Sequence, residues 1–124
     1  MRSVLVTHAV LAGVAATALA TSAAFAAGKL APSEVQATFF DGQPFTAATP
    51  QGIRYKMVFT ADGKMTREPI GRSGAKSEGT WKLSKDGYCT TWKNDRPNCF
   101  AVLNTSDNKW SVMKGTTAVA TWTK

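Results

Sequence analysis

The chain is poor in the residues on which most catalytic sites depend. It has a single histidine, His8, and two cysteines among its 124 residues. His8 lies in an N-terminal segment that we expect to be removed, so the mature chain would hold no histidine. A serine or cysteine nucleophile would then lack the imidazole base of the standard catalytic triads. We therefore predict that this protein is not an enzyme.

Metal and acid–base sites also have little support in the sequence. We expect the two cysteines to be bonded to each other, which leaves no soft ligand for a metal. The eight carboxylates are scattered, and at least four lie in predicted turns, where Asp is favoured by hydrogen bonds to nearby backbone. Glu68 and Glu78 flank one loop, but we weigh a structural role for them far above a catalytic pair. We predict no metal and no cofactor.

Long apolar runs are absent except at the N terminus. Arg2 is followed by an apolar stretch at 4–19 and by the small-x-small sequence A-F-A at 24–26. This order is typical of a secretory signal peptide and its cleavage site. The stretch is rich in Ala, whereas a membrane anchor needs about 20 strongly apolar residues. We predict a signal peptide over 1–26 and one mature domain over 27–124, periplasmic or secreted, with no transmembrane segment in the mature chain.

Export would place the two cysteines in a compartment where disulfides persist. Cys89 and Cys99 are ten positions apart, and folding the chain about Asn94 sets them opposite each other in an antiparallel pair. A zinc knuckle or a C-x-x-C redox motif has a different spacing. We predict one intramolecular disulfide, which the chain-entropy model values at about 3 kcal/mol for a loop of this length.

The mature chain reads mainly as β structure. Turn signals recur every eight to twelve residues, which is typical of an antiparallel sheet. The dipeptides at 62–63 and 86–87 are both Asp-Gly, in which Gly supplies the positive φ of a tight hairpin turn. Tyr55, Met57 and Phe59 alternate with polar or smaller residues. We predict an antiparallel meander of about seven strands that forms a small barrel or sandwich.

One short helix is expected before the strands, over 30–40. Pro32 suits the first helical position and Glu34 the first turn, while later apolar residues would face the sheet. Residues 45–51, rich in Thr, Ala and Pro, are predicted to be a loop or an irregular edge strand. Residues 71–77 are small, polar and basic, and we expect this loop to be the most mobile part of the mature domain.

The charge balance of the expected mature chain is basic, with 14 Lys and Arg against 8 Asp and Glu. Such a surface favours anionic partners, for example lipid headgroups or other envelope components. The charges are spread singly, so solubility and weak surface association are the simpler interpretation. The candidate anion-binding or rim residues are Arg72, Lys76 and Arg96. An exported location argues against nucleic acid as a partner.

Aromatic residues recur about once per predicted strand. In a domain of this size they belong first of all to the core. The alternative is that some of them line a cavity or a barrel mouth, since small barrels with aromatic interiors hold single apolar ligands. The candidate ligand-binding residues are Tyr55, Trp81, Tyr88, Trp92 and Trp110.

Three motifs follow the signal peptide in order: K-L-A-P-S-E-V-Q at 29–36, F-T-A-D-G-K at 59–64, and G-T-W-K-L, D-G-Y-C-T-T-W and C-F between 79 and 100. Together they resemble a group of small exported alphaproteobacterial proteins that carry a domain of unknown function. The resemblance covers most of the mature chain and implies no catalytic residues. The G-T-W sequence is also similar to the G-x-W motif of lipocalins, which implies a barrel-like shape.

These observations predict a periplasmic or secreted binding or accessory protein without catalytic activity. It would hold a small apolar ligand or contact an envelope component. The alternative is a protein–protein interaction module or an enzyme inhibitor of the cell envelope. A ligand binder should show an internal cavity reached by aromatic side chains, and an interaction module should show a filled core with an exposed apolar patch. The sequence does not indicate an oligomeric state.

Overall fold

The computed structural model describes Gly13 and residues 28–124. The predicted signal peptide and cleavage site, apart from Gly13, lie outside the described residues. One helix, α1 (Pro32–Phe39), precedes eight strands. The strands are β1 (Phe45–Ala48), β2 (Arg54–Phe59), β3 (Lys64–Pro69), β4 (Ser77–Leu83), β5 (Tyr88–Trp92), β6 (Asn98–Ser106), β7 (Lys109–Lys114) and β8 (Thr117–Thr123).

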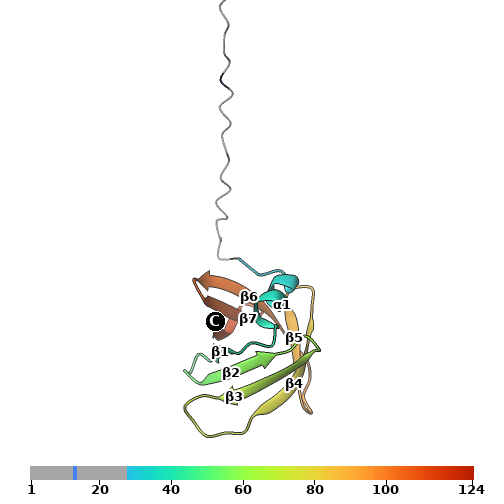
Figure 1. Ribbon diagram of the computed structural model, residues 1–124, viewed down its shortest axis with the longest axis vertical. Coiled ribbons are helices and arrows are strands. Elements are labelled where there is room, and N and C mark those ends of the chain that lie inside the picture. The colour runs from blue at the N-terminus through green and yellow to red at the C-terminus, as the bar shows by residue number, and fades with distance from the viewer. Residues whose placement is uncertain (1–12, 14–27) are drawn as a thin grey trace, which may run out of the picture.

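The eight strands form a closed antiparallel barrel (Figure 1). Each strand pairs with its neighbours in sequence, and β8 returns to β1 with Ala47 opposite Trp122. The short connections explain this order, because strands joined by tight turns pair with each other. Closure also leaves no sheet edge exposed for aggregation. The predicted meander is confirmed, and of the two predicted shapes the structure has the barrel.

The strand that exceeds the predicted number is β1, in the stretch expected to be a loop or an irregular edge strand. It is paired on both sides, with β2 and with β8, so it is no edge. Phe45 and Ala47 are buried, while the residues between and after them are half-buried. This alternation is that of a strand, but four residues that include two alanines give too short a pattern to identify a strand from sequence.

α1 covers one end of the barrel, which we name the closed end (Figure 1). The helix begins at Pro32, as predicted, and the Ala31 N–H donates a hydrogen bond of 3.0 Å to the Glu34 carboxylate. Its eight residues are too few for independent stability, so packing must hold it. Two residues of the helix, Val35 and Phe39, are fully buried.

The opposite end of the barrel, which we name the open end, has no helix across it in the described part of the chain. Consecutive antiparallel strands run in opposite directions, so every second connection lies at the same end. The open end is therefore formed by four loops, at 49–53, 70–76, 93–97 and 115–116. The loop at 70–76 includes the predicted mobile stretch except for Ser77, which begins β4, and its residues from 71 to 76 are exposed.

Phe39, the last residue of α1, and Phe40, which follows it, fill the closed end of the barrel. We name residues 32–40 the helix segment. The Phe39 ring lies 4.8 Å from the Trp110 ring in an edge-to-face arrangement. The Phe40 ring stacks on Phe59 with centroids 4.4 Å apart and lies 4.5 Å from Trp81. Aromatic pairs at these distances add to the free energy of simple burial. The helix and the barrel therefore share one aromatic core.

The G-T-W motif of β4 has a structural explanation. Gly79 lies where a Cβ atom would come within 2.7 Å of Met65 Cε and of the Thr91 carbonyl oxygen, so no larger residue fits without movement. The Trp81 indole N–H donates to the Thr60 carbonyl at 2.8 Å, and the Trp81 backbone N–H donates to Gly63 at the same distance. The motif thus ties β4 to the turn between β2 and β3.

Cys89 and Cys99 form the predicted disulfide, between directly paired residues of β5 and β6. These two strands pair over only three residue positions. The turn that brings them together has Asn94 at φ 64°, a conformation that Asn adopts more readily than most residues. The covalent bond therefore reinforces a short ladder of the barrel.

Replacing both cysteines with serine should lower the free energy of unfolding by about 3 kcal/mol, because the unfolded chain gains the entropy of an open loop. Urea denaturation followed by circular dichroism measures this loss. The wild-type protein treated with reductant is the control and should unfold at the same urea concentration as the variant. An unchanged midpoint in both samples would show that the bond adds nothing to stability.

Phe40→Ala should destabilise the domain by about 3–5 kcal/mol, because it leaves a cavity where the helix segment meets the barrel. The midpoint of thermal unfolding reports the loss. Ser33→Ala, on the exposed face of α1, is the matched control and should change stability by less than about 0.5 kcal/mol. If both variants melt like the wild type, the helix segment does not hold the closed end.

Candidate ligand-binding site

The barrel interior is not completely filled. A cavity of about 160 Å³ is lined by residues from seven strands and from the start of one open-end loop. Phe59, Val112 and Trp122 form part of its lining on the side of the buried core, and Thr49 and Arg67 belong to the open end. The cavity therefore lies between the aromatic core and the open end.

The lining of this cavity combines aromatic and small side chains. β5 contributes Tyr88 and Trp92, and Tyr55 of β2 joins them in the lining. β1 and β8 contribute Ala47 and Ala120. Ala47 pairs in register with Tyr55 on one side and with Trp122 on the other, so small and aromatic side chains are neighbours in the lining. The methyl side chains leave unfilled the space that larger residues would occupy.

Arg67 is the charged member of the described cavity lining. It is paired in register with the buried Met57 and follows the buried Met65 by two positions, so its side chain belongs to the inward face of β3. Its Cζ atom lies 4.8 Å from the centroid of the Tyr55 ring and 4.5 Å from that of Trp92. Cation–π attraction thus holds the guanidinium among the aromatic side chains.

The guanidinium of Arg67 has no anionic partner in the part of the chain that the structure describes. None of the four ion pairs there includes it, and neither does any side-chain hydrogen bond. A guanidinium carries five N–H donors in its plane, and ring contacts to its faces use none of them. Its donors are therefore available to a ligand.

Two hydroxyl groups add polarity to the cavity. Tyr88 is 3% exposed and Thr90 6% exposed, and both belong to the lining. Burial raises the pKa of Tyr88 well above its ordinary value of 10.0, so the phenol stays neutral and able to donate. The cavity thus combines an apolar body with a few polar groups, which is the usual composition of a small-molecule site.

Of the five predicted ligand-binding aromatics, the structure brings three together at the cavity: Tyr55, Tyr88 and Trp92. It places the other two at the closed end, where Trp81 packs on Phe40 and Trp110 on Phe39. Their contacts are with the core, so they are not part of this site. The residues that sequence reasoning missed are Ala47, Arg67, Thr90, Phe100 and Ala120.

The sequence did contain a signal for Arg67. It lies in phase with Met65 in a strand whose inward face is otherwise apolar, and an arginine in that phase is an exception to the alternation. Ala47 and Ala120 gave no such signal, because a small residue attracts attention only when its surroundings are known to be large.

The three predicted rim residues all belong to open-end loops and are exposed. Lys76 lines a surface hollow of about 390 Å³ together with Arg67, Trp92 and Lys93. Arg72 and Arg96 do not line this hollow. The structure therefore associates one of the three predicted cations with the cavity mouth.

Two ion pairs of the described chain join segments that meet at the closed end of the barrel. At the closed end, Lys29 Nζ lies 2.8 Å from Asp86, and Lys124 Nζ lies 3.3 Å from Asp41. The hydrogen bond from Lys29 lowers the pKa of Asp86. The open end gathers basic residues that take part in no ion pair of the described chain: Arg54, Arg67, Arg72, Lys76, Lys93, Arg96 and Lys114.

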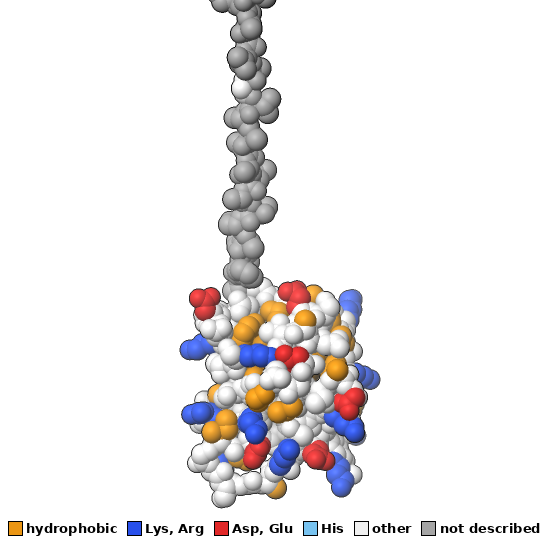
Figure 2. All heavy atoms as spheres, viewed as in Figure 1, with side chains coloured by type: hydrophobic (Ala, Val, Ile, Leu, Met, Phe, Trp, Pro, Cys, Tyr) orange, Lys and Arg blue, Asp and Glu red, His pale blue; other side chains and the backbone are white. Residues whose placement is uncertain are grey.

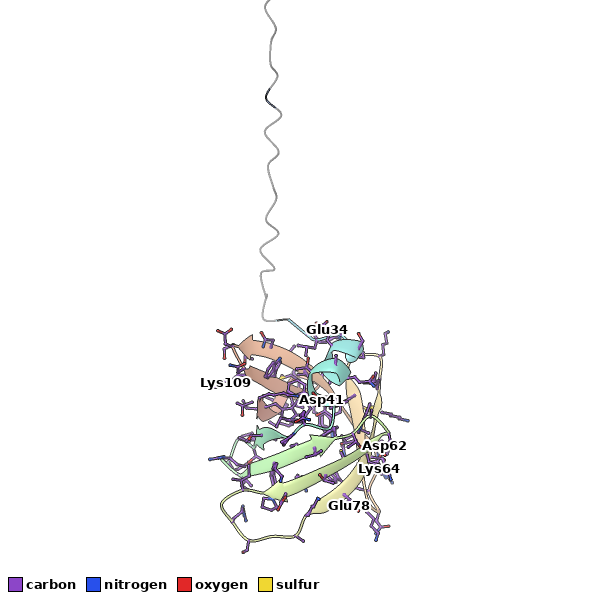
Figure 3. All side chains as sticks on the ribbon, in the orientation of Figure 1. Glu34, Asp41, Asp62, Lys64, Glu78 and Lys109 are labelled. Atoms are coloured by element: carbon purple, nitrogen blue, oxygen red, sulfur yellow. A yellow bond between two sulfur atoms is a disulfide. The ribbon has the colours of Figure 1, made fainter. Side chains whose placement is uncertain are left out.

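The acidic residues form no cluster. Glu34, Asp41, Asp62 and Glu78 lie apart from one another (Figure 3). Glu68, which with Glu78 flanks the loop at 70–76, has its carboxylate 3.4 Å from Lys56 Nζ. Basic and acidic side chains are interspersed over the visible face of the molecule (Figure 2). Among the described residues, no three His, Cys, Asp or Glu side chains come together as metal ligands.

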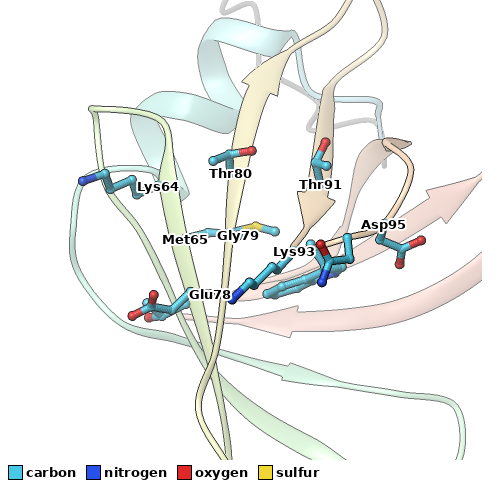
Figure 4. A pocket seen from close by; sticks show the side chains of 11 residues that line it. Lys64, Met65, Glu78, Gly79, Thr80, Thr91, Lys93 and Asp95 are labelled. Carbon is cyan, nitrogen blue, oxygen red and sulfur yellow. The ribbon is translucent and has the colours of Figure 1, made fainter.

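A larger hollow of about 600 Å³ lies across β3, β4 and β5 (Figure 4). Lys64, Thr80 and Thr91, which share one register row on the outer face, form part of its lining. Glu78 and Lys93 add opposite charges. Eight of its eleven lining residues are polar or charged, whereas most residues that line the barrel cavity are apolar.

The fold and the cavity together define a small closed β-barrel with an internal cavity. No model of a known protein family matches the chain, and no curated protein or solved structure is significantly similar to it. The resemblance to exported alphaproteobacterial proteins and to lipocalins therefore stays a prediction. No helix in residues 28–124 is long and apolar enough to cross a membrane.

Replacing Arg72 and Lys76 together with alanine should leave the fold intact, because both side chains extend from an exposed loop. We expect each substitution to change the free energy of unfolding by less than about 0.5 kcal/mol. Thermal unfolding with and without the substitutions tests this. A drop of several degrees in the melting temperature would show that this loop packs on the barrel.

Proposed function

We propose that this protein is an exported, non-catalytic binding protein that holds a small, largely apolar ligand inside its barrel, reached from the open end. The observation that carries the proposal is the 160 Å³ cavity, whose lining combines aromatic side chains with Ala47 and Ala120. Export rests on the predicted signal peptide, and the disulfide of the described domain is compatible with an oxidising compartment.

The volume of the cavity limits the size of its ligand. An engineered cavity of about 150 Å³ lined by apolar side chains binds benzene, whereas sites for drug-sized molecules measure about 300–1,000 Å³. A space of about 160 Å³ therefore suits a single ring or a short branched chain. A long acyl chain would not fit.

The alternative, a protein–protein module or an enzyme inhibitor, has less support. Such a module is expected to expose a contiguous apolar patch over a filled core. In the described part of the chain, Leu83 is the one large hydrophobic residue that is exposed, at 37%. A single such residue is ordinary for a soluble surface. The cavity thus favours ligand binding.

Benzene or toluene should raise the melting temperature of the purified protein, because a ligand that binds only the folded state stabilises it by mass action. At a concentration one hundred times Kd the gain is about 2.7 kcal/mol. Calorimetric unfolding with increasing toluene measures it. The absence of any rise with either compound would contradict the proposal.

Ala120→Leu should abolish this effect, because the larger side chain fills the cavity from β8. Ala118→Leu is the matched control: it is the same substitution on the same strand at an exposed position. The control should respond to toluene like the wild type. If Ala120→Leu folds and still gains the full stabilisation, the compound binds elsewhere.

A further inference from the structure

Resting on the proposed function, we propose that the ligand of this cavity is a small carboxylate, whose apolar part occupies the barrel and whose anionic group binds Arg67. The structural basis is the position of Arg67 at the junction between the cavity and the hollow outside it, since it lines both. A ligand that enters from the open end would bring its polar group to this residue.

The environment of Arg67 favours an anion over any other partner. Its side chain is directed inward and half-buried, and a charge in such a place is normally paired. The described residues supply rings to its faces but no carboxylate. A planar guanidinium held by ring contacts presents its in-plane N–H groups as a fork, which matches the two oxygens of a carboxylate.

The charged residues around the cavity mouth also favour an anionic ligand. The hollow outside Arg67 is also lined by Lys76 and Lys93, against one carboxylate, Glu78. Three cations facing one anion give this entrance a positive potential, which raises the local concentration of anionic ligands. On the inner side, Tyr88 and Thr90 provide neutral hydroxyls for a second polar contact.

The competing explanation is that Arg67 only seals the barrel through its contacts with Tyr55 and Trp92. The two explanations differ in what they predict for ligands of the same shape and different charge. A sealing role gives neutral and anionic ligands the same affinity. A recognition role gives the anion an advantage that depends on the guanidinium.

The test is isothermal titration calorimetry of the folded protein with benzoate and with toluene, at neutral pH and fixed ionic strength. The two probes share a ring and differ in the carboxylate. We expect benzoate to bind about ten-fold tighter or more, the range for a hydrogen-bonded charged pair. Arg67→Met should remove this advantage, so that the variant binds the two probes about equally. Arg72→Met is the matched control, an exposed arginine of the same end, and should retain the advantage.

The outcomes separate the two proposals. If neither probe binds the wild type, the proposed function itself fails. If toluene binds and benzoate binds no tighter, or if Arg67→Met weakens both probes equally, the binding function stands and the carboxylate inference is wrong. Should Arg67→Met fail to fold, Arg67→Lys keeps the charge but not the fork, and full retention of the benzoate advantage there would overturn the assigned bidentate contact.

Discussion

The structure depends on the packing of the helix segment into one end of an eight-stranded barrel. Such a barrel is just wide enough to be packed by its own side chains. Here the strands alone do not complete the packing, and Phe39 and Phe40 enter from outside the sheet to meet Trp110, Trp122, and Phe59. Because the helix segment fills the closed end, the unfilled space remains at the open end. The packed aromatic core and the unfilled cavity thereby lie toward opposite ends of the same barrel interior.

This separation explains the distribution of residue types. The closed end uses aromatic rings at van der Waals distance and local pairs of opposite charge. The open end combines small residues, the aromatic side chains of Tyr55 and Trp92, and unpaired cations. A protein selected for stability alone would replace Ala47 and Ala120 with larger apolar residues, since filling a cavity commonly stabilises a fold. Their small size is consistent with selection for a bound molecule.

Much of the architecture could be predicted from local patterns, and the site could not. Asp-Gly turns and alternation identified most strands, and the turn at Asn94 placed Cys89 opposite Cys99. The closing strand β1 was missed because its four residues carry little pattern and its partner β8 lies far away in the sequence. Trp81 and Trp92 look alike in sequence, yet they lie at different levels of the barrel. That level depends on strand stagger, which no local pattern contains.

The pairing of β1 with β8 has a consequence for the order of folding. Thr46 lies opposite Thr123, so the sheet closes through contacts between the two extremes of the described domain. Contacts of such long sequence separation form slowly, because the loop entropy is lost before they stabilise the chain. The barrel thus stays incomplete until its last strand has been synthesised. A barrel that closes late leaves the chain unfolded for longer. The export that we propose would require this if the chain crosses the membrane in an extended state.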